Sequence, residues 1–198
     1  MDCIMIFGPG AVGKMTVGRA LAARTGLRLF HNHMTIDLLL PFFPFGSPPF
    51  SRLVREFRTR IFEEVAQSDL PGLIFTYVWA LDHSGDRAFV DHLTGIFTAH
   101  GGRVGYVELY ASQAERLRRN VLPDRLALKP SKRDVTRSER NLLEADELHR
   151  LNSDGDFFYP ERHLKLDTGR LTPQEAAARI VAAFDLPLLD SDGAGSDG

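Results

Sequence analysis

Disulfide partners, a strong net charge and long apolar runs are all missing from this sequence of 198 residues. Its one cysteine, Cys3, cannot pair within the chain, so a reducing cytoplasm is the expected compartment. A formal net charge of -2 argues against general binding to nucleic acid. The most apolar segment, residues 36–45, is short and contains Pro41 and Pro44, so no membrane contact is predicted. Nothing in the composition indicates an oligomeric state.

Short apolar runs alternate with helical patterns along the chain, which is typical of repeated βα units around a parallel sheet. Five strands are predicted, at 3–7, 27–31, 72–79, 103–110 and 163–167. Helices are predicted at 13–24, 35–40, 51–68, 86–100, 112–121, 138–150 and 172–184. The sequence therefore predicts one α/β domain over 1–186, followed by a disordered polar tail over 187–198.

Two local patterns refine the predicted helices. In 51–68, apolar residues at helical spacing predict one buried stripe made of Leu53, Val54, Phe57, Ile61 and Val65. The S/T-x-x-E capping box marks two other helix starts, at Ser112 with Glu115 and at Thr172 with Glu175.

The stretch "FGPGAVGKMT", residues 7–16, fits two phosphate-binding patterns. Its glycines spell G-x-G-x-x-G, the dinucleotide fingerprint, and also G-x-x-x-x-G-K, the P-loop. A lysine after the last glycine can reach the β- and γ-phosphates of a nucleotide, and the dinucleotide motif requires no charge there. A dinucleotide binder also needs an acid after its second strand, where this chain has "FHNH" and no acid before Asp37. Both tests favour the P-loop.

The predicted nucleotide-binding residues are therefore the loop itself: Gly8, Pro9, Gly10, Ala11, Val12, Gly13, Lys14, Met15 and Thr16. The position after Lys14 usually carries Ser or Thr, whose hydroxyl holds Mg²⁺, and here it is Met15. Thr16 becomes the candidate metal ligand. A glycine-rich turn that binds nothing is the alternative.

With this loop, the chain except its tail resembles the P-loop small-molecule kinases, a group that includes shikimate, gluconate and nucleotide kinases and chloramphenicol phosphotransferase. The adenylate-kinase type of loop, with threonine two residues after the lysine, is the more similar one. The resemblance implies a three-layer P-loop NTPase fold, a sheet in the order 2-3-1-4-5 with helices on both faces, and a helical lid after the fourth strand. It also implies ATP and Mg²⁺ as cofactors.

The predicted lid, about 121–137, lies in the most basic stretch of the chain, residues 116–140. Because phosphoryl transfer spreads negative charge over the equatorial oxygens, positioned cations are the main contribution a protein can make. Arg116 is predicted to stack on the adenine, and Arg119 and Arg133 to contact the phosphates. A solvated basic loop is the alternative.

The acceptor side rests on fewer residues. The resemblance places a carboxylate after the second strand to orient or deprotonate the acceptor hydroxyl, and Asp37 is the only acid there. Asn32 and His33 are candidate substrate ligands. The alternative is that they are partly exposed residues at the strand end without a role in binding. Asp37 could instead be a helix-start acid favoured by the helix dipole.

Two further residues have paired interpretations. Arg58 either binds an anionic group of the substrate or is a solvated helix residue. Asp82 ends an apolar run as a Walker B acid does, so it either holds Mg²⁺ or starts a loop. The glutamate and the Gly-Gly-Gly turn of shikimate kinases are absent at Ile61 and in "TYVWALD", which disfavours shikimate as the acceptor.

The sequence thus predicts an enzyme that transfers the γ-phosphate of ATP to a hydroxyl or phosphate of a small molecule. An ATPase or nucleotide-binding regulator without an acceptor is the second hypothesis, and a nicotinamide oxidoreductase is a distant third.

Overall fold

A computed structural model describes residues 1–123 and 134–189 of the chain. Its strands are β1 (Asp2–Phe7), β2 (Arg28–His31), β3 (Gly72–Thr76), β4 (Arg103–Tyr110) and β5 (His163–Asp167). They form one sheet in the order β2-β3-β1-β4-β5, and every neighbouring pair is parallel. The predicted α/β class and strand order are confirmed.

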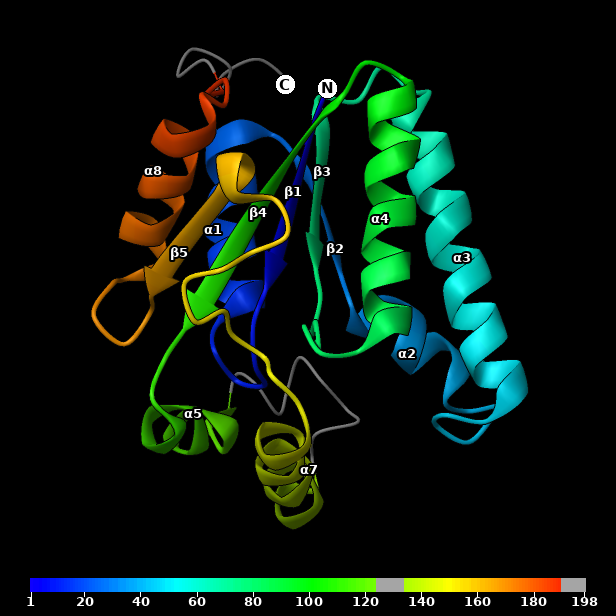
Figure 1. The fold of residues 1–198 in the computed structure, drawn as a ribbon, viewed down its shortest axis with the longest axis vertical. Helices are drawn as coiled ribbons and strands as arrows, with labels where there is room; N and C mark the ends of the chain where they lie inside the picture. The colour runs from blue at the N-terminus through cyan, green and yellow to red at the C-terminus, as the bar shows by residue number, and fades with distance from the viewer. Residues whose placement is uncertain (124–133, 190–198) are drawn as a thin grey trace, which may run out of the picture.

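Helices cover both faces of this sheet (Figure 1). Helices α1 (Lys14–Thr25) and α8 (Pro173–Phe184) cover one face, and α3 (Pro48–Ala66) and α4 (Ser84–Ala99) cover the other. The short helix α2 (His33–Leu39) leads from the end of β2 toward α3. Beyond the carboxyl ends of the strands lie α5 (Gln113–Asn120) and α7 (Val135–Leu148), and a single turn, η2 (Pro160–Arg162), precedes β5.

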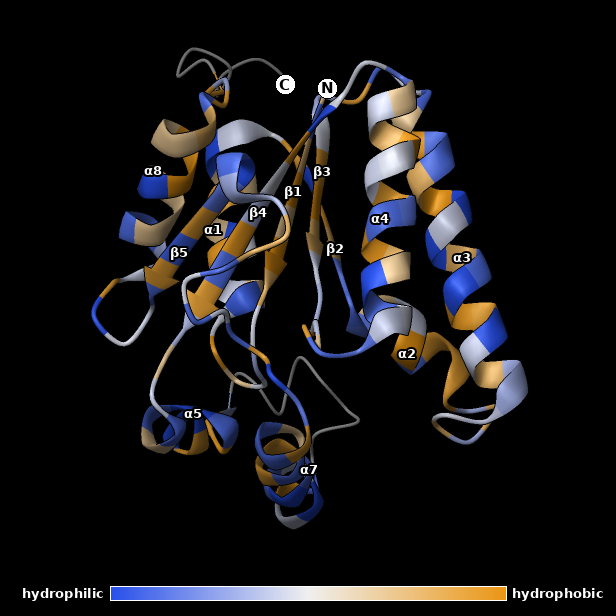
Figure 2. Ribbon diagram, viewed as in Figure 1, coloured by the Kyte–Doolittle hydropathy of each residue, from blue (hydrophilic) through white to orange (hydrophobic). Residues whose placement is uncertain are grey.

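The core has two halves, one on each face of the sheet. Successive residues of β1 point alternately to the two sides, so Cys3, Met5 and Phe7 join the cluster under α3 and α4, and Ile4 and Ile6 join the cluster under α1 and α8. Figure 2 shows apolar residues concentrated in the central strands β1 and β3, as expected for strands of a parallel sheet covered on both faces.

The predicted stripe of α3 is wrong by one residue for part of its length. Phe57 and Ile61 are exposed, whereas the buried row is Phe50, Val54, Arg58, Phe62 and Ala66. Hydrophobicity predicted the helix but not its rotation, because polar contacts of one buried arginine at the sheet edge favour this face.

Other differences are small. Strand β3 ends at Thr76, before the predicted 79; the Tyr77 amide still donates to the Ile6 carbonyl, and beyond it Trp79 is buried among other aromatic rings. The capping box of Thr172 and Glu175 is confirmed. At α5, Ser112 accepts from the Glu115 amide, but the Glu115 carboxylate pairs with Arg118 and Arg119 instead of closing the box.

The end of the described chain reaches further than predicted. Residues 187–189 fall in the predicted disordered tail, yet the Leu189 amide donates to the Arg24 carbonyl at 2.9 Å. The rest of that tail lies outside the described residues. Among the helices the structure describes, none is both long enough and apolar enough to cross a membrane.

A buried carboxylate on β4 holds the segment 149–162 in place through hydrogen bonds. Glu108 of β4 is fully buried and accepts hydrogen bonds from the Ser153 amide at 2.9 Å and the Asn152 side chain at 2.9 Å. His163 Nε2 lies 3.0 Å from this carboxylate, and so does Lys165 Nζ. Burial by itself would raise the pKa of Glu108, but its hydrogen bonds to His163, Ser153 and Lys165 outweigh that effect and lower the pKa to about 2.

Acid should therefore weaken these interactions of Glu108 and lower the free energy of unfolding. The stabilisation by ionised Glu108 is complete above the unfolded-state pKa of about 4.5 and is lost as the pH falls through about 2. A shift of this size corresponds to about 3 kcal/mol of unfolding free energy. Urea unfolding between these pH values should show the advantage of wild type over Glu108→Gln shrinking as the pH falls. Glu144→Gln, at an exposed position of α7, is the matched control. A wild-type advantage that does not change with pH would contradict this account.

Candidate functional site

The turn between β1 and α1 has the backbone geometry that its glycines predict. Gly8 and Gly13 have φ angles of 130° and 101°, and Ala11 also lies in the left-handed region at 60°. A Cβ on Gly8 would lie 2.3 Å from the carbonyl oxygen of Leu109, so only glycine fits there. Because α1 begins at Lys14, its unpaired amides point into this turn, which makes an anion-binding site.

Lys14 extends back over the same turn. Its Nζ donates to the Gly8 carbonyl at 2.6 Å and to the Pro9 carbonyl at 2.7 Å. The ammonium thus lies above the loop whose amides would receive a phosphate, which is where a P-loop lysine is needed.

The next two residues face different ways. Met15 is buried, and its thioether offers no hard oxygen ligand. Thr16 is exposed at the start of α1, so its hydroxyl is the side-chain oxygen available there. Within 1–123 and 134–189, no group of three or more His, Cys, Asp or Glu could hold a metal ion.

Arg119 of α5 lies directly beside the turn. Its Nη1 donates to Thr168 Oγ1 at 3.2 Å and lies 3.4 Å from the Val12 carbonyl. The hydroxyl of Thr168 donates to the same carbonyl at 2.8 Å. The predicted position of Arg119 beside the phosphates is thus compatible with the geometry. Thr168 was missed by the sequence reasoning, although its place directly after β5 is a usable signal.

Arg116 does not lie open to a base. Its side chain is buried, and Nη1 and Nη2 donate to the two carboxylate oxygens of Asp146 at 3.0 and 2.5 Å. In this arrangement the pair ties α5 to α7, and the stacking of Arg116 on adenine stays a prediction. Arg133, with most of the predicted lid, lies outside the described residues.

The start of α2 lies on the same edge of the sheet as the P-loop. The Asn32 amide donates to Thr76 Oγ1 at 3.2 Å, and the Tyr77 amide donates to the Ile6 carbonyl at 3.0 Å. The ends of β2, β3 and β1 are therefore in register. Since neighbouring strands are separated by about 4.8 Å, the α2 start lies about 10 Å from the turn after β1.

Two enclosed oxygens mark this edge. Asn32 Oδ1 and Asp37 Oδ1 are buried, and within the described part of the chain neither has a hydrogen-bond partner. His33 Nδ1 lies 3.7 Å from Asp37 Oδ1. Unpartnered buried acceptors are costly, so this edge is suited to a ligand that brings hydrogen-bond donors.

Arg58 is buried beneath the start of α2, so the solvated alternative is wrong. Its Nε donates to Thr35 Oγ1 at 3.0 Å, and its Nη2 donates to the Asn32 carbonyl at 3.1 Å. Burial lowers the pKa of Arg58 to about 10, which keeps it a cation at neutral pH. No carboxylate of the described residues forms an ion pair with it.

Sequence reasoning missed a polar pair next to Arg58. The Tyr77 hydroxyl donates to Asp86 Oδ1 at 3.0 Å, and the Ala80 amide donates to Asp86 Oδ2 at 3.0 Å. The Arg58 guanidinium lies 6.0 Å from the centre of the Tyr77 ring. Burial and the adjacent Asp86 carboxylate raise the pKa of Tyr77, so its hydroxyl stays protonated. Tyr77 was placed in a strand and Asp86 in a helix, so no sequence pattern joined them.

Asp82 has contacts that match its loop-initiating alternative. Its Oδ1 accepts from the Arg150 amide at 3.1 Å and lies 3.7 Å from His149 Nδ1. The carboxylate thus joins the loop after β3 to the segment that follows α7. A magnesium role for Asp82 stays a prediction.

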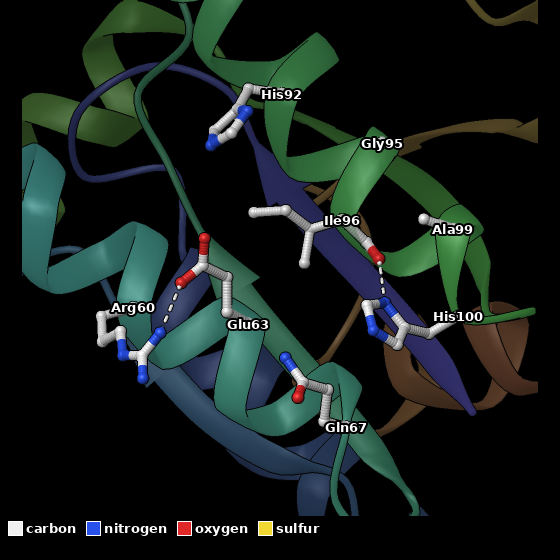
Figure 3. Close-up of a pocket in the computed structure, with 8 residues that line it drawn as sticks. All are labelled: Arg60, Glu63, Gln67, His92, Gly95, Ile96, Ala99 and His100. Carbon is white, nitrogen blue, oxygen red and sulfur yellow. Dashed lines mark hydrogen bonds and ion pairs between the residues drawn. The ribbon is translucent and has the colours of Figure 1, made fainter.

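A shallow hollow of about 590 Å³ lies elsewhere, between α3 and α4 (Figure 3). Its walls carry an ion pair from Arg60 to Glu63 and a hydrogen bond from His100 to the Ile96 carbonyl. These residues occupy the halves of α3 and α4 that lie away from the carboxyl ends of the strands, so the hollow takes no part in the candidate site.

Neither a protein-family model nor a curated protein sequence matches this chain. Solved structures do match it. A sugar kinase from Janibacter sp. HTCC2649 has a TM-score of 0.57 at 16% identity, covering 94% of this chain and 95% of its own. The tunicamycin resistance protein of Deinococcus radiodurans has a TM-score of 0.54 at 21% identity, covering 96% and 99%.

A third similar structure is the APS kinase of Mycobacterium tuberculosis, solved with AMPPNP and APS. Its TM-score is 0.57 at 13% identity, covering 93% of this chain and 97% of its own. Shikimate kinase and gluconokinase structures match as well. The chain has the fold of the P-loop small-molecule kinases.

Proposed function

We propose that this protein is an ATP-dependent phosphotransferase acting on a hydroxyl or phosphate of a small molecule. The observation that carries the proposal is the turn after β1, whose glycine geometry aims the α1 amides into a loop covered by the Lys14 ammonium. Such a loop binds the β- and γ-phosphates of a nucleoside triphosphate.

The nucleotide half of the site would be held mainly by backbone. The amides of the turn would hold the phosphates, Lys14 would neutralise the transferred group, and Arg119 would approach it from α5. When bound with the nucleotide, Mg²⁺ would supply positive charge that offsets the charge developing on the phosphates. Thr16 is the protein oxygen we assign to it. Since Met15 supplies no oxygen ligand, the remaining oxygen ligands of Mg²⁺ would come mostly from phosphate and water.

The half of the site that binds the phosphate acceptor would be formed by the carboxyl end of β2 and by α2. Asn32 Oδ1 and Asp37 Oδ1 are enclosed acceptors that suit a substrate bearing hydroxyl groups. The buried cation Arg58, without a carboxylate partner in the described chain, suits a substrate that also carries negative charge. The carboxylate of Asp37 would orient or accept the proton of the reacting group.

A screen of hydroxylated metabolites, nucleosides and antibiotics tests this function. Each compound is incubated with the protein, ATP and Mg²⁺, and ADP release is compared with the rate in its absence. At least one compound should raise the rate. Uniformly basal ADP release would favour a nucleotide-binding regulator without an acceptor.

A further inference from the structure

Helix α2 and the loop that joins it to α3 expose a group of large apolar side chains. Within twelve positions, Met34 is 46% exposed, Leu38 54%, and Phe42 and Phe45 are each 71% exposed. The described chain exposes twelve large hydrophobic residues, so a third of them belong to this one stretch. Single exposed apolar residues need no explanation, but a local group of them indicates a contact surface.

The loop itself is held firmly from beneath. The Phe42 amide donates to the Leu39 carbonyl at 3.0 Å, and the Phe45 ring lies 5.2 Å from the ring of Phe50. Phe50 and Leu39 belong to a small buried cluster that also contains Ile36 and Val54. Because the backbone rests on this cluster, the fold presents the rings of Phe42 and Phe45 to solvent in fixed places.

The exposure of these two rings indicates what kind of partner fits them. Side chains that line a small-molecule site are enclosed, because such sites are concave and cover most of their ligand. Phe42 and Phe45 project instead, with most of each side chain open to solvent. A projecting ring is buried by a partner that closes around it, and the interfacial region of a lipid bilayer does so without a preformed cavity.

The charge around the loop favours an anionic partner. Residues 38–55 contain no Asp or Glu, although the chain as a whole has a net charge of -2. Arg52 and Arg55 are exposed on the first turns of α3, and neither forms an ion pair in the part of the chain that the structure covers. Arg52 follows closely after Phe50, so its cation lies near the loop. Apolar side chains beside unpaired cations are typical of proteins that bind anionic lipid surfaces.

We propose that the loop between α2 and α3 docks this protein on an anionic lipid surface. Phe42 and Phe45 insert at the level of the headgroups, and Arg52 and Arg55 face the lipid phosphates. The prediction of no membrane contact rested on the lack of a spanning segment, whereas surface docking needs only exposed apolar side chains. Since Asp37 and Leu38 are consecutive residues of α2, docking would bring the proposed acceptor side close to the lipid.

Co-sedimentation of the full chain with vesicles, without nucleotide, tests this proposal. Wild type should bind vesicles of equal parts phosphatidylcholine and phosphatidylglycerol more tightly than vesicles of phosphatidylcholine alone. Phe42→Ser and Phe45→Ser should each weaken binding to both kinds of vesicle by about 10-fold, the effect of losing one partly buried ring. Arg52→Gln and Arg55→Gln should each weaken only the binding to anionic vesicles, by about fivefold.

Leu188→Ser is the matched control for Leu38→Ser, because the two leucines are 55% and 54% exposed. Leu188 follows α8 at the amino ends of the strands, whereas the loop lies near their carboxyl ends (Figure 1). Leu38→Ser should weaken vesicle binding, and Leu188→Ser should bind as wild type does. In Phe42→Trp the emission of the new indole should shift to the blue on anionic vesicles, and in Leu188→Trp it should not. Substitutions at these exposed positions should leave the melting midpoint unchanged.

Three results would overturn the proposal. One is wild-type protein that sediments with neither kind of vesicle. Another is an equal loss of binding in Leu38→Ser and Leu188→Ser. The third is a wild-type dimer in sedimentation equilibrium without lipid, which Phe42→Ser dissociates while no vesicle is bound; the surface would then belong to a second copy of the chain. Vesicle binding needs no nucleotide, so these results leave the proposed phosphotransfer to be tested separately.

Discussion

Lys14→Ala should lower ATP turnover by about 10²- to 10³-fold in a protein that remains folded, the range for removing one group that stabilises developing charge. The physical reason is that Lys14 provides a full positive charge above the turn after β1, where charge collects on the transferred phosphate. Its two hydrogen bonds to the Gly8 and Pro9 carbonyls contribute only about 1 kcal/mol each to folding. The melting midpoint should therefore change far less than turnover.

Arg19→Ala is the matched control, because Arg19 is an exposed cation on the same helix, facing solvent. It should leave ATP affinity and turnover at wild-type values. Unchanged ATP affinity and turnover in folded Lys14→Ala would remove Lys14 from the phosphate site.

Gly8→Ala should be the most damaging single-methyl change in the turn. At φ of 130° a side chain is strained, and the new Cβ would lie 2.3 Å from the Leu109 carbonyl oxygen. Strain and overpacking together should cost about 2 to 6 kcal/mol of unfolding free energy. Any variant that folds must move the turn away from β4, so ATP affinity should fall as well. Chemical unfolding and ATP titration on the same preparation measure both effects.

Gly10→Ala provides the comparison within the same loop. Its φ is not positive, and a Cβ there would come no closer than 3.8 Å to the Leu142 side chain. We expect a change in stability below about 1 kcal/mol. Equal stability losses in the two variants would mean that the close approach of the loop to β4 is not the reason that position 8 requires glycine.

The sheet and its order could be predicted because the evidence for them is local and redundant. Each strand is a short apolar run, each helix has a periodic pattern, and the P-loop motif fixes which strand comes first. The ends of β4 and β5 are as predicted. The rotation of α3 could not be predicted, because burying Arg58 in place of Phe57 depends on two acceptors, Asn32 and Thr35, supplied by a distant part of the chain.

The same limit applies to the candidate site. The P-loop is a contiguous motif, so its conformation follows from its glycines. Arg116 was predicted to bind the nucleotide because the sequence shows only that it is a cation in a basic stretch. Its partner Asp146 lies 30 residues away, so the ion pair could not be predicted. Tyr77 and Asp86 were missed because each fits a regular element, and only the fold brings the hydroxyl and the carboxylate together.

The most direct measurement is a calorimetric titration of the wild-type protein with ATP, GTP and NADH, each in the presence of Mg²⁺. A P-loop covered by Lys14 predicts that a nucleoside triphosphate binds and that NADH binds far more weakly, because the end of β2 carries no acidic side chain before Asp37 to receive the ribose hydroxyls. Tight binding of NADH without affinity for ATP or GTP would contradict the account at its root.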